Sequence, residues 1–276
     1  MCERKAIIFY VSLSIFPPAR LLPVLFVIVA TRLVGAEIGE MAGEIPRTSV
    51  HYAETTPLMT AEDTDPAWNR AEPCTLSQTE GGAAGLQQEG TKTWLLWRED
   101  FFYIRFECVD KERYKHPDPA SPVYQSDVVE VFLDPRGDGR QWMELQVDGQ
   151  GRIFDKLFLL TAEPRSGPDG VLLPEVDKLD RWDIEAWEWL GVKTAVSRSD
   201  SGWIVDIALL AKPTLRRLGL TSYREGLALR ANFVRYDWRE VSASATRSLV
   251  SSNWSPVAFG NPHKSPLRMG FIDLVR

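Results

Sequence analysis

The sequence predicts an all-β fold, an antiparallel β-sandwich of the jelly-roll or immunoglobulin-like type. Short segments of alternating apolar and polar residues recur along the chain, and turns rich in Gly, Asp and Pro separate them. Helical character is confined to one short stretch, and a Trp-rich loop insertion over 161–191 interrupts the strands. With 276 residues, 44% of them hydrophobic, the chain is long enough to bury one large β core.

The first 36 residues predict a signal peptide, because a basic start and two apolar runs lead to a small-residue cleavage pattern ending at Ala36. The alternative is an uncleaved membrane anchor. Prolines separate the two runs, however, and neither run reaches the roughly 20 residues of a spanning helix. We therefore expect an exported protein, whether periplasmic, cell-surface or extracellular. Residues 37–60 are polar and aperiodic, which predicts a linker or N-terminal arm before the domain at 61–276.

Within 61–276 the strands are expected to pair largely as hairpins, because turn residues separate successive segments. In the segment over 101–109, Tyr103, Arg105 and Glu107 alternate with apolar residues, which predicts one solvent-facing and one core-facing side. The predicted strands are Lys92–Trp97, Phe101–Val109, Ser126–Asp134, Gln141–Val147, Arg152–Leu159, Val192–Ser197, Trp203–Leu209, Leu227–Tyr236 and Met269–Leu274, with a short helix at Pro213–Leu218.

One of these strands carries a carboxylate among apolar neighbours. Side chains alternate between the two faces of a strand, so Val128, Glu130 and Phe132 share one face. An unpaired buried charge costs roughly several kcal/mol, so Glu130 must find a partner or hold a ligand. An ion pair with Arg235 or Arg230 is the structural interpretation. Glu130 is the best single indicator of a functional site.

Charge and cysteine content exclude several classes of partner. The formal net charge is −6 and no basic stripe is present, which argues against nucleic acid and anionic membranes. Cys74 and Cys108 form a disulfide in an exported protein or serve as small buried hydrophobes, and their spacing fits no zinc site. Asp-rich turns at 134–138 and 148–151 offer oxygen ligands for calcium. Most such turns bind only water, so we predict no cofactor.

Three other functions are considered: two from the residues themselves, and haem binding because related β-sandwiches of electron-transfer proteins bind haem. Glu130 and Glu144 on successive strands form a carboxylate pair of the kind glycosidases use for acid/base chemistry. A haem-binding sandwich needs facing axial ligands, and His263 and Met269 are too close in sequence to make a convincing pair. A surface-assembly protein would use the tryptophans of the 161–191 insertion against a partner.

Four segments in order resemble carbohydrate-binding module family 9, in its stand-alone bacterial family-9-like branch. The resemblance covers about residues 60–276 and implies a β-sandwich that binds sugar and is not an enzyme. The segments are Asp65-Pro66-Ala67-Trp68 with Ala71, Trp94–Trp97 leading to Phe102-Tyr103-Ile104, Ser126–Asp134, and Ser201–Ala208 preceding Ala231-Asn232-Phe233.

In that family a sugar ring is clamped between aromatic side chains while polar groups read its hydroxyls. The resemblance implies that Tyr124 stands in place of one clamp Trp, and that Glu130, Gln146 and Asn232 are the polar readers, with Arg235 close by. Since Asn232 and Arg235 are three residues apart, a regular strand would point them to opposite faces.

The second clamp aromatic of the family lies in the tail. His263 occupies about that place in this sequence, and Trp254 is the nearest tryptophan, which is also a candidate for the core. The sequence thus departs from a clamp of two tryptophans.

Overall fold

The computed structural model describes residues 44–62, 64–78, 90–112, 114–159, 191–240, 247–257 and 262–276. All of these belong to one compact unit, Met41–Arg276. The predicted signal peptide and nearly all of the 161–191 insertion lie outside the described residues. Across the described ranges, no helix has both the length and the apolar character needed to cross a membrane.

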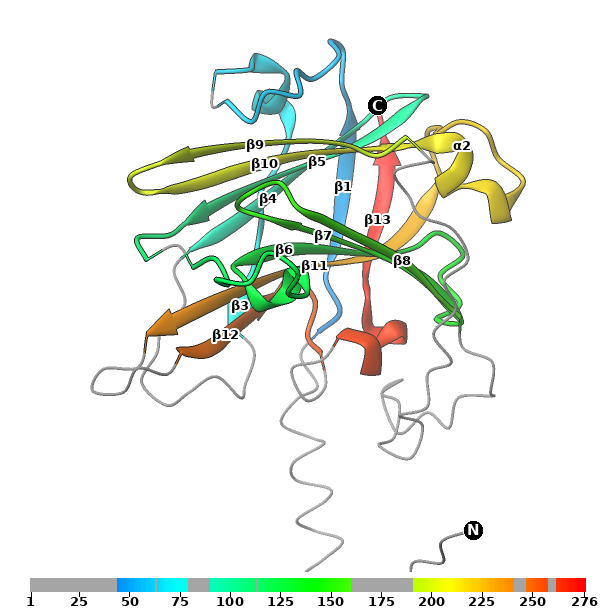
Figure 1. Ribbon diagram of the computed structural model, residues 1–276. Helices are drawn as coiled ribbons and strands as arrows, with labels where there is room; N and C mark the ends of the chain where they lie inside the picture. The colour runs from blue at the N-terminus through cyan, green and yellow to red at the C-terminus, as the bar shows by residue number, and fades with distance from the viewer. Residues whose placement is uncertain are drawn as a thin grey trace, which may run out of the picture. The chain divides into compact units, whose positions relative to one another are not determined.

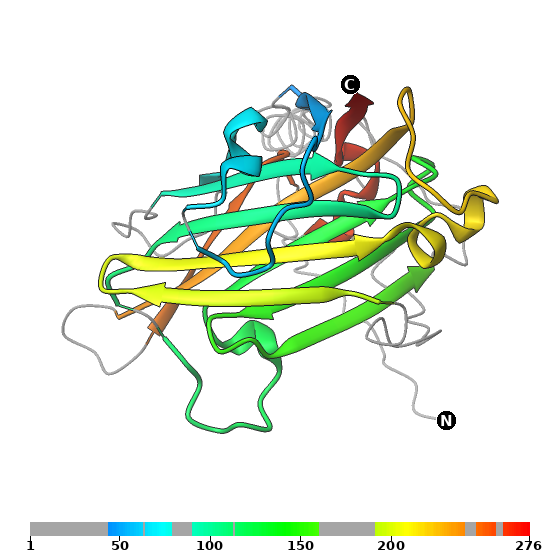
Figure 2. The ribbon, with the colours of Figure 1, turned by 90° about the horizontal axis from the view of Figure 1, so that it is seen from above.

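The described strands join into one curled sheet that folds over itself as a β-sandwich, which confirms the predicted fold class (Figures 1 and 2). Its hydrogen-bonded order is β8-β7-β6-β11-β13-β1-β4-β5-β10-β9, with β12 beside β11, β2 beside β4 and β3 beside β12. The layer of β6, β7, β8 and β11 is crossed by the layer of β4, β5, β9 and β10, and a hydrophobic core fills the space between them.

The elements have the following bounds. The strands are β1 (Arg47–Tyr52), β2 (Cys74–Thr75), β3 (Ser77–Gln78), β4 (Thr91–Trp97), β5 (Phe101–Val109), β6 (Val128–Asp134), β7 (Gln141–Asp148), β8 (Ile153–Leu159), β9 (Lys193–Ser199), β10 (Gly202–Leu210), β11 (Ala228–Glu240), β12 (Arg247–Asn253) and β13 (Gly270–Val275). The α-helical turn is α2 (Ala211–Thr214), and the 3-10 turns are η1 (Pro66–Arg70), η2 (Val123–Gln125), η6 (Arg216–Leu218), η8 (Pro262–Lys264) and η9 (Pro266–Arg268).

The segment predicted as a linker or arm contains β1, a strand in the middle of the sheet. β1 pairs in parallel with both β13 and β4, so the sheet is mixed where the sequence predicted antiparallel pairing. Of its six residues only Val50 is fully buried. Its sequence therefore shows no apolar alternation, and strand neighbours on both sides supply the stability that its own composition does not indicate.

The expected solvent-facing side of β5 is in fact covered. Tyr103 and Arg105 are buried: Ala53 and Trp68 share a hydrophobic cluster with Tyr103, and Arg105 lies against the ring of Trp68 in η1. Arg105 forms a two-bond ion pair with Asp206 of β10, at 2.7 and 2.9 Å, beneath the ring of Trp68. The alternation in β5 is real, but a remote segment supplies the cover, so a strand-by-strand analysis could not reveal it.

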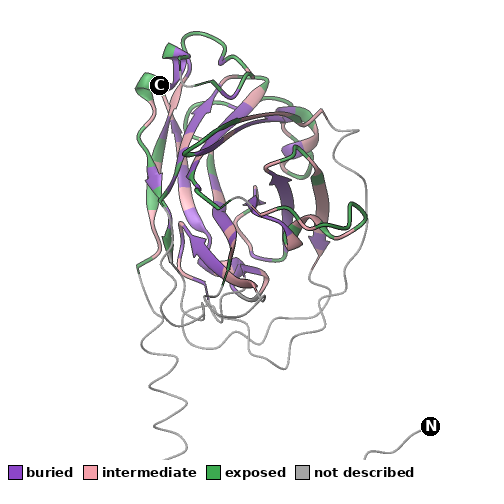
Figure 3. Ribbon diagram, turned by 60° about the vertical axis from the view of Figure 1, so that its left-hand side comes forward, coloured by how far each residue is buried: buried purple, intermediate pink, exposed green. Residues whose placement is uncertain are grey.

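Most strand residues in the described chain are buried, as the purple colouring of Figure 3 shows. Cys74 and Cys108 are both buried and both free, on strands that flank β4. Burial raises the pKa of each thiol to about 11. They therefore act as small core residues, the second of the two predicted interpretations.

Candidate functional site

Glu130 lies at the centre of the β6–β7–β11 sheet, on the face turned away from the interlayer core. All seven residues of β6 are buried. Glu130 pairs in register with Gln146 of β7 and Val234 of β11, so these three side chains share that face. Glu144 lies two positions from Gln146 on β7, and Tyr236 lies two positions from Val234 on β11, so both share this face as well. We call Glu130, Glu144, Gln146 and Tyr236 the polar wall.

A single amide links the two carboxylates of the polar wall. Gln146 Nε2 donates to Glu130 Oε1 at 2.9 Å and to Glu144 Oε1 at 2.7 Å. Because carboxylates only accept, this fixes which end of the Gln146 amide is nitrogen. Gln146 Oε1 is then left buried without a hydrogen-bond partner in the described chain. A buried acceptor without a partner is costly and calls for an explanation.

The two carboxylates differ in how many positively charged or hydrogen-bonding partners surround them. Glu144 has Lys156 opposite it on β8 and His263 at 3.4 Å. Glu130, only 1% exposed, has no ion pair within the described residues. Burial and the charge of Glu144 raise the pKa of Glu130 well above its ordinary value. Burial and the same two carboxylates also raise the pKa of the Tyr236 hydroxyl. Glu130 therefore differs from a structural buried charge, which would be paired.

The ion pair considered for Glu130 does not form. Arg235 points from the opposite face of β11 into the core, where it pairs with Asp110. Arg230 donates to the backbone carbonyls of Leu267 and Met269. Neither guanidinium therefore neutralises Glu130.

His263 of η8 closes the end of this face near Phe132. Its ring centroid lies 5.1 Å from that of Phe132 and 4.4 Å from that of Phe158. Trp142 Nε1 donates to His263 Nδ1 at 3.2 Å, while His263 Nε2 faces Glu144 Oε2 at 3.4 Å. The histidine is thus connected to the polar wall and enclosed by aromatic rings.

Tyr124 lies at the opposite end of β6, in η2, and is 45% exposed. Its backbone carbonyl accepts a hydrogen bond from Trp238 Nε1 at 3.0 Å. Trp238 of β11 shares the face of Tyr236, since the two are separated by two positions. Glu130 therefore lies between Tyr124 at one end of β6 and His263 at the other.

The remaining predicted site residues have structural surroundings. Asn232 shares the face of Glu130, but its amide donates to Asn253 and Ser255 and accepts from the Ser255 backbone at 2.8 Å. Trp254 packs on Phe233, with ring centroids 5.4 Å apart, and belongs to the interlayer core. Its ring also lies against β13, where only Gly270 fits, since a Cβ there would come within 2.3 Å of the ring.

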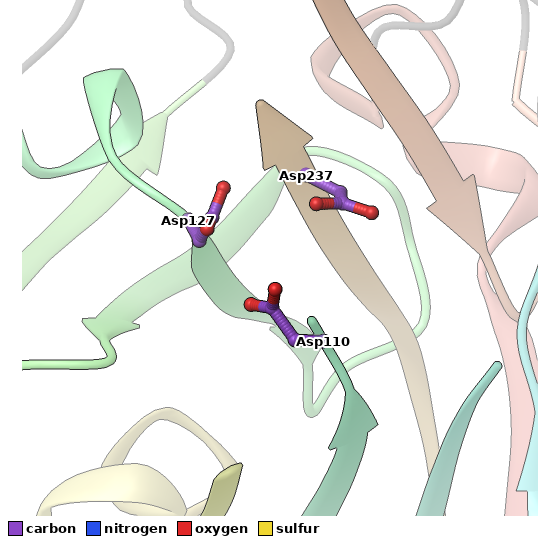
Figure 4. Close-up of side chains that lie close together, drawn as sticks. All are labelled: Asp110, Asp127 and Asp237. Carbon is purple, nitrogen blue, oxygen red and sulfur yellow. The ribbon is translucent and has the colours of Figure 1, made fainter. Parts of the chain in front are cut away.

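Arg235 belongs to a buried acidic cluster of Asp110, Asp127 and Asp237, whose carboxylate oxygens lie within 4.8 Å of one another (Figure 4). Arg235 Nη2 lies 3.0 Å from Asp110 and 3.4 Å from Asp237. Trp203 Nε1 also donates to Asp110. The positive charge between these aspartates is a guanidinium, so the geometry describes a charge-paired core network. Asn232 and Arg235 do face opposite ways, as the three-residue spacing predicted.

Asp127 ties the loop before β6 to β11. It accepts hydrogen bonds from the backbone N–H groups of Tyr114 and Trp238, the latter at 2.7 Å. Burial, together with the charge of Asp110, raises its pKa to about 7. A water-sized cavity of about 30 Å³ lies beside Asp110 and Asp127. This aspartate holds the base of the loop that carries Tyr124.

The two Asp-rich turns considered for calcium use their carboxylates locally. Asp134 accepts from the backbone N–H groups of Gly137 and Gly139, both at 2.8 Å. Asp148 accepts from the backbone of Gln150 and from Arg152, whose Nε lies at 2.7 Å. These oxygens are directed at N–H donors, the pattern of turns closed by aspartate.

Sequence reasoning missed two parts of this site. Trp142 and Tyr236 were assigned no role, although each lies two positions from another residue of the same face. The alternation of Trp142, Glu144 and Gln146 along β7 could have identified the first. Tyr236 becomes visible only through the pairing of β11 with β6.

The sheet architecture is that of a β-sandwich, and the polar wall lies on one of its faces. The model of the family described as "Carbohydrate family 9 binding domain-like" matches residues 61–153. Residues 61–153 are therefore similar to that family, and three of the four sequence segments that carry the resemblance lie within this range. No protein among the curated sequences matches significantly.

Solved structures share the fold. A carbohydrate-binding module family 9 from Caldicellulosiruptor kristjanssonii in complex with cellotriose is 19% identical, with a TM-score of 0.56 over 83% of this chain and 93% of that one. The glucose complex of a family 9 module from the same organism is 19% identical, with a TM-score of 0.54 over 83% and 96%. A structure from Bacteroides uniformis is 14% identical, with a TM-score of 0.60 over 83% and 99%.

Proposed function

We propose that the protein is an exported, non-catalytic carbohydrate-binding module that holds a sugar against the polar wall. The observation that carries this proposal concerns the Gln146 amide. Its Nε2 donates to both carboxylates, and its Oε1 stays buried without a hydrogen-bond partner among the described residues. Sugar hydroxyls are donors that can satisfy such an acceptor and the carboxylates beside it. The ligands of the two Caldicellulosiruptor structures, cellotriose and glucose, are of this chemistry.

Tyr124 offers an exposed ring at one end of the wall, where the C–H face of a pyranose can stack. The site would then combine one aromatic platform, Tyr124, with the hydrogen-bond acceptors of the polar wall. Asn232, Arg235 and Trp254 stay outside the proposed contact set, because each is committed to structural partners.

The arrangement favours binding over glycoside hydrolysis. A glycosidase places two carboxyl groups on either side of the scissile bond, about 5 to 10 Å apart. Here Glu130 and Glu144 each use one oxygen to accept from the same nitrogen, so both belong to one wall. In the haem alternative the candidate axial ligand was His263, and both of its ring nitrogens face protein partners.

A glycan array followed by titration calorimetry with mono- and oligosaccharides, including glucose and cellotriose, tests the proposal. We expect saturable binding by the wild type and at least about tenfold weaker binding by Glu130→Gln, because the substitution replaces an acceptor oxygen of the polar wall by an amide donor. Glu54→Gln, at an exposed carboxylate, is the matched control. Absence of binding across the panel, or unchanged affinity in Glu130→Gln, would contradict it.

Export is tested separately. Expression of the full chain, followed by cell fractionation and N-terminal sequencing, should locate the mature protein outside the cytoplasm with a new N-terminus near residue 37. An intact N-terminus on protein retained in the cytoplasm would refute export without affecting the sugar-binding proposal.

A further inference from the structure

His263 packs among three aromatic rings of the protein, those of Phe132, Trp142 and Phe158. Phe158 lies 4.4 Å from the ring, tilted by 53°, and Phe132 meets it edge-on at 5.1 Å. The side chain is only 17% exposed. A ring that stacks on a sugar must present a free face, as Tyr124 can. The position that resembles the family's second clamp aromatic is therefore largely buried against aromatic rings of the protein, which disfavours its use as a stacking platform.

The two ring nitrogens of His263 have different hydrogen-bonding roles. Trp142 Nε1–H can only donate, so the ring nitrogen that receives it, Nδ1, must be unprotonated. The proton of the neutral imidazole is then on Nε2, the nitrogen that faces Glu144 Oε2 at 3.4 Å. Trp142, which is fully buried, thus selects the tautomer that turns a donor toward the carboxylate.

From Glu144 the connection continues to the unpaired acceptor. Glu144 Oε1 and Glu130 Oε1 receive the two protons of the Gln146 amide, which fixes the direction of Gln146 Oε1. Four contacts therefore run in series from Trp142 through His263, Glu144 and Gln146 to Glu130. Holding one oxygen of Glu144 from the His263 side leaves the other in place for Gln146.

We propose that His263 is a positioning residue for sugar recognition, which orients Glu144 and thereby the Gln146 amide, rather than a ring that contacts the sugar. This inference rests on the proposed carbohydrate-binding function and identifies the residue that organises its polar wall. It assigns the second-clamp position of the tail a polar role in place of a stacking role.

Three substitutions separate positioning from stacking. His263→Gln places an amide N–H near the Nε2 position and should keep affinity within about threefold of the wild type. His263→Asn retains only the Nδ1 side, and His263→Phe retains only the ring. Both should weaken binding by about tenfold or more, as expected for loss of a hydrogen bond to a charged group. The measurement is titration calorimetry with the best ligand from the array.

The opposite ranking would overturn the inference. If His263→Phe binds as tightly as the wild type while His263→Gln does not, the ring itself is what the ligand uses. Circular dichroism and thermal melting of each variant identify any that fail to fold, and those are set aside. The ranking is then made among the folded ones and supplemented by spectroscopy.

Nitrogen NMR of the imidazoles supplies that second readout and requires no sugar. The protein has three histidines, and the His263 signal is assigned by its loss in His263→Gln. We expect Nδ1 unprotonated and Nε2 protonated, with the tautomer preference relaxed in Trp142→Phe. A proton on Nδ1 would overturn the inference. If the wild type binds no sugar, the proposed function fails; if it binds and the His263→Phe variant equals it, only this inference fails.

Discussion

Two buried carboxylates on opposite layers of the sandwich meet different fates. Asp206 of β10 receives two hydrogen bonds from the Arg105 guanidinium and a third from the backbone N–H of Ala61 at 2.7 Å. Glu130 of β6 receives a single hydrogen bond from a neutral amide and lies beside a second carboxylate. Asp206 is thus a fully compensated carboxylate that stabilises the fold. Glu130 is poorly compensated, as expected for a group kept for ligand recognition.

Removal of the charge of Asp206 should have the largest effect on stability. Asp206→Asn leaves the buried Arg105 without its counter-ion, and breaking such a pair costs about 3–5 kcal/mol. Urea denaturation should show a free energy of unfolding that is lower by that amount, as a lower midpoint with an unchanged slope. Since the pair lies on the layer away from the polar wall, sugar affinity should persist in the folded variant. A loss of unfolding free energy below about 1 kcal/mol would contradict the assignment of Asp206 to stabilising the fold.

Asp127 lies between these two extremes, because backbone N–H groups and a shared guanidinium partly compensate it. Its folded pKa of about 7 exceeds the unfolded value of about 3.9. The folded state therefore keeps a proton that the unfolded state releases between these values. Stability should fall as pH rises from about 4 to 7, by at most about 1.4 kcal/mol per pH unit, and then level off.

Denaturation midpoints of wild type and Asp127→Asn across pH 4 to 8 measure this contribution. The variant should lack it, so the stability difference between the two proteins should shift in the variant's favour as pH rises. A difference that stays constant over this range would show that Asp127 is ionised throughout.

Glu130→Gln should have the smallest effect on stability and an effect of opposite sign to Asp206→Asn. The raised pKa of Glu130 means that wild-type stability decreases as pH rises above the unfolded value of about 4.3. The neutral variant avoids this loss, so its stability relative to the wild type should increase as pH rises. Melting temperatures at pH 5 and pH 8 test this, and destabilisation at both pH values would assign Glu130 a structural role.

The sequence identified the strand signals and the anomalous carboxylate because both depend on local alternation. The hairpin of β7 and β8 and the strand around Glu130 were predicted close to their bounds. β1 was missed because its stability comes from two parallel neighbours remote in sequence. The cover over Arg105 was missed for the same reason, since Trp68, which lies against it, comes from a segment remote in sequence.

The sequence could predict those residues of the candidate site that share one face of the β6–β7 hairpin. The β6–β7 pairing joins Glu130 to Gln146, and a hairpin register makes this foreseeable. The commitment of Asn232 to the corner at Ser255 and the enclosure of His263 depend on where the tail folds back. Such tertiary placement is independent of strand periodicity, so those residues were expected at the ligand and are found among structural partners.

The most direct test of the account measures melting temperatures of wild type, Asp206→Asn and Glu130→Gln with and without a saturating sugar ligand. A ligand that binds only the folded state raises the melting temperature. The account predicts that Asp206→Asn melts lower yet keeps the ligand-induced rise, whereas Glu130→Gln melts no lower than the wild type and loses that rise. The reverse pattern, a sugar-induced rise that survives in Glu130→Gln and disappears in Asp206→Asn, would contradict the assignment of Glu130 to recognition and Asp206 to the fold.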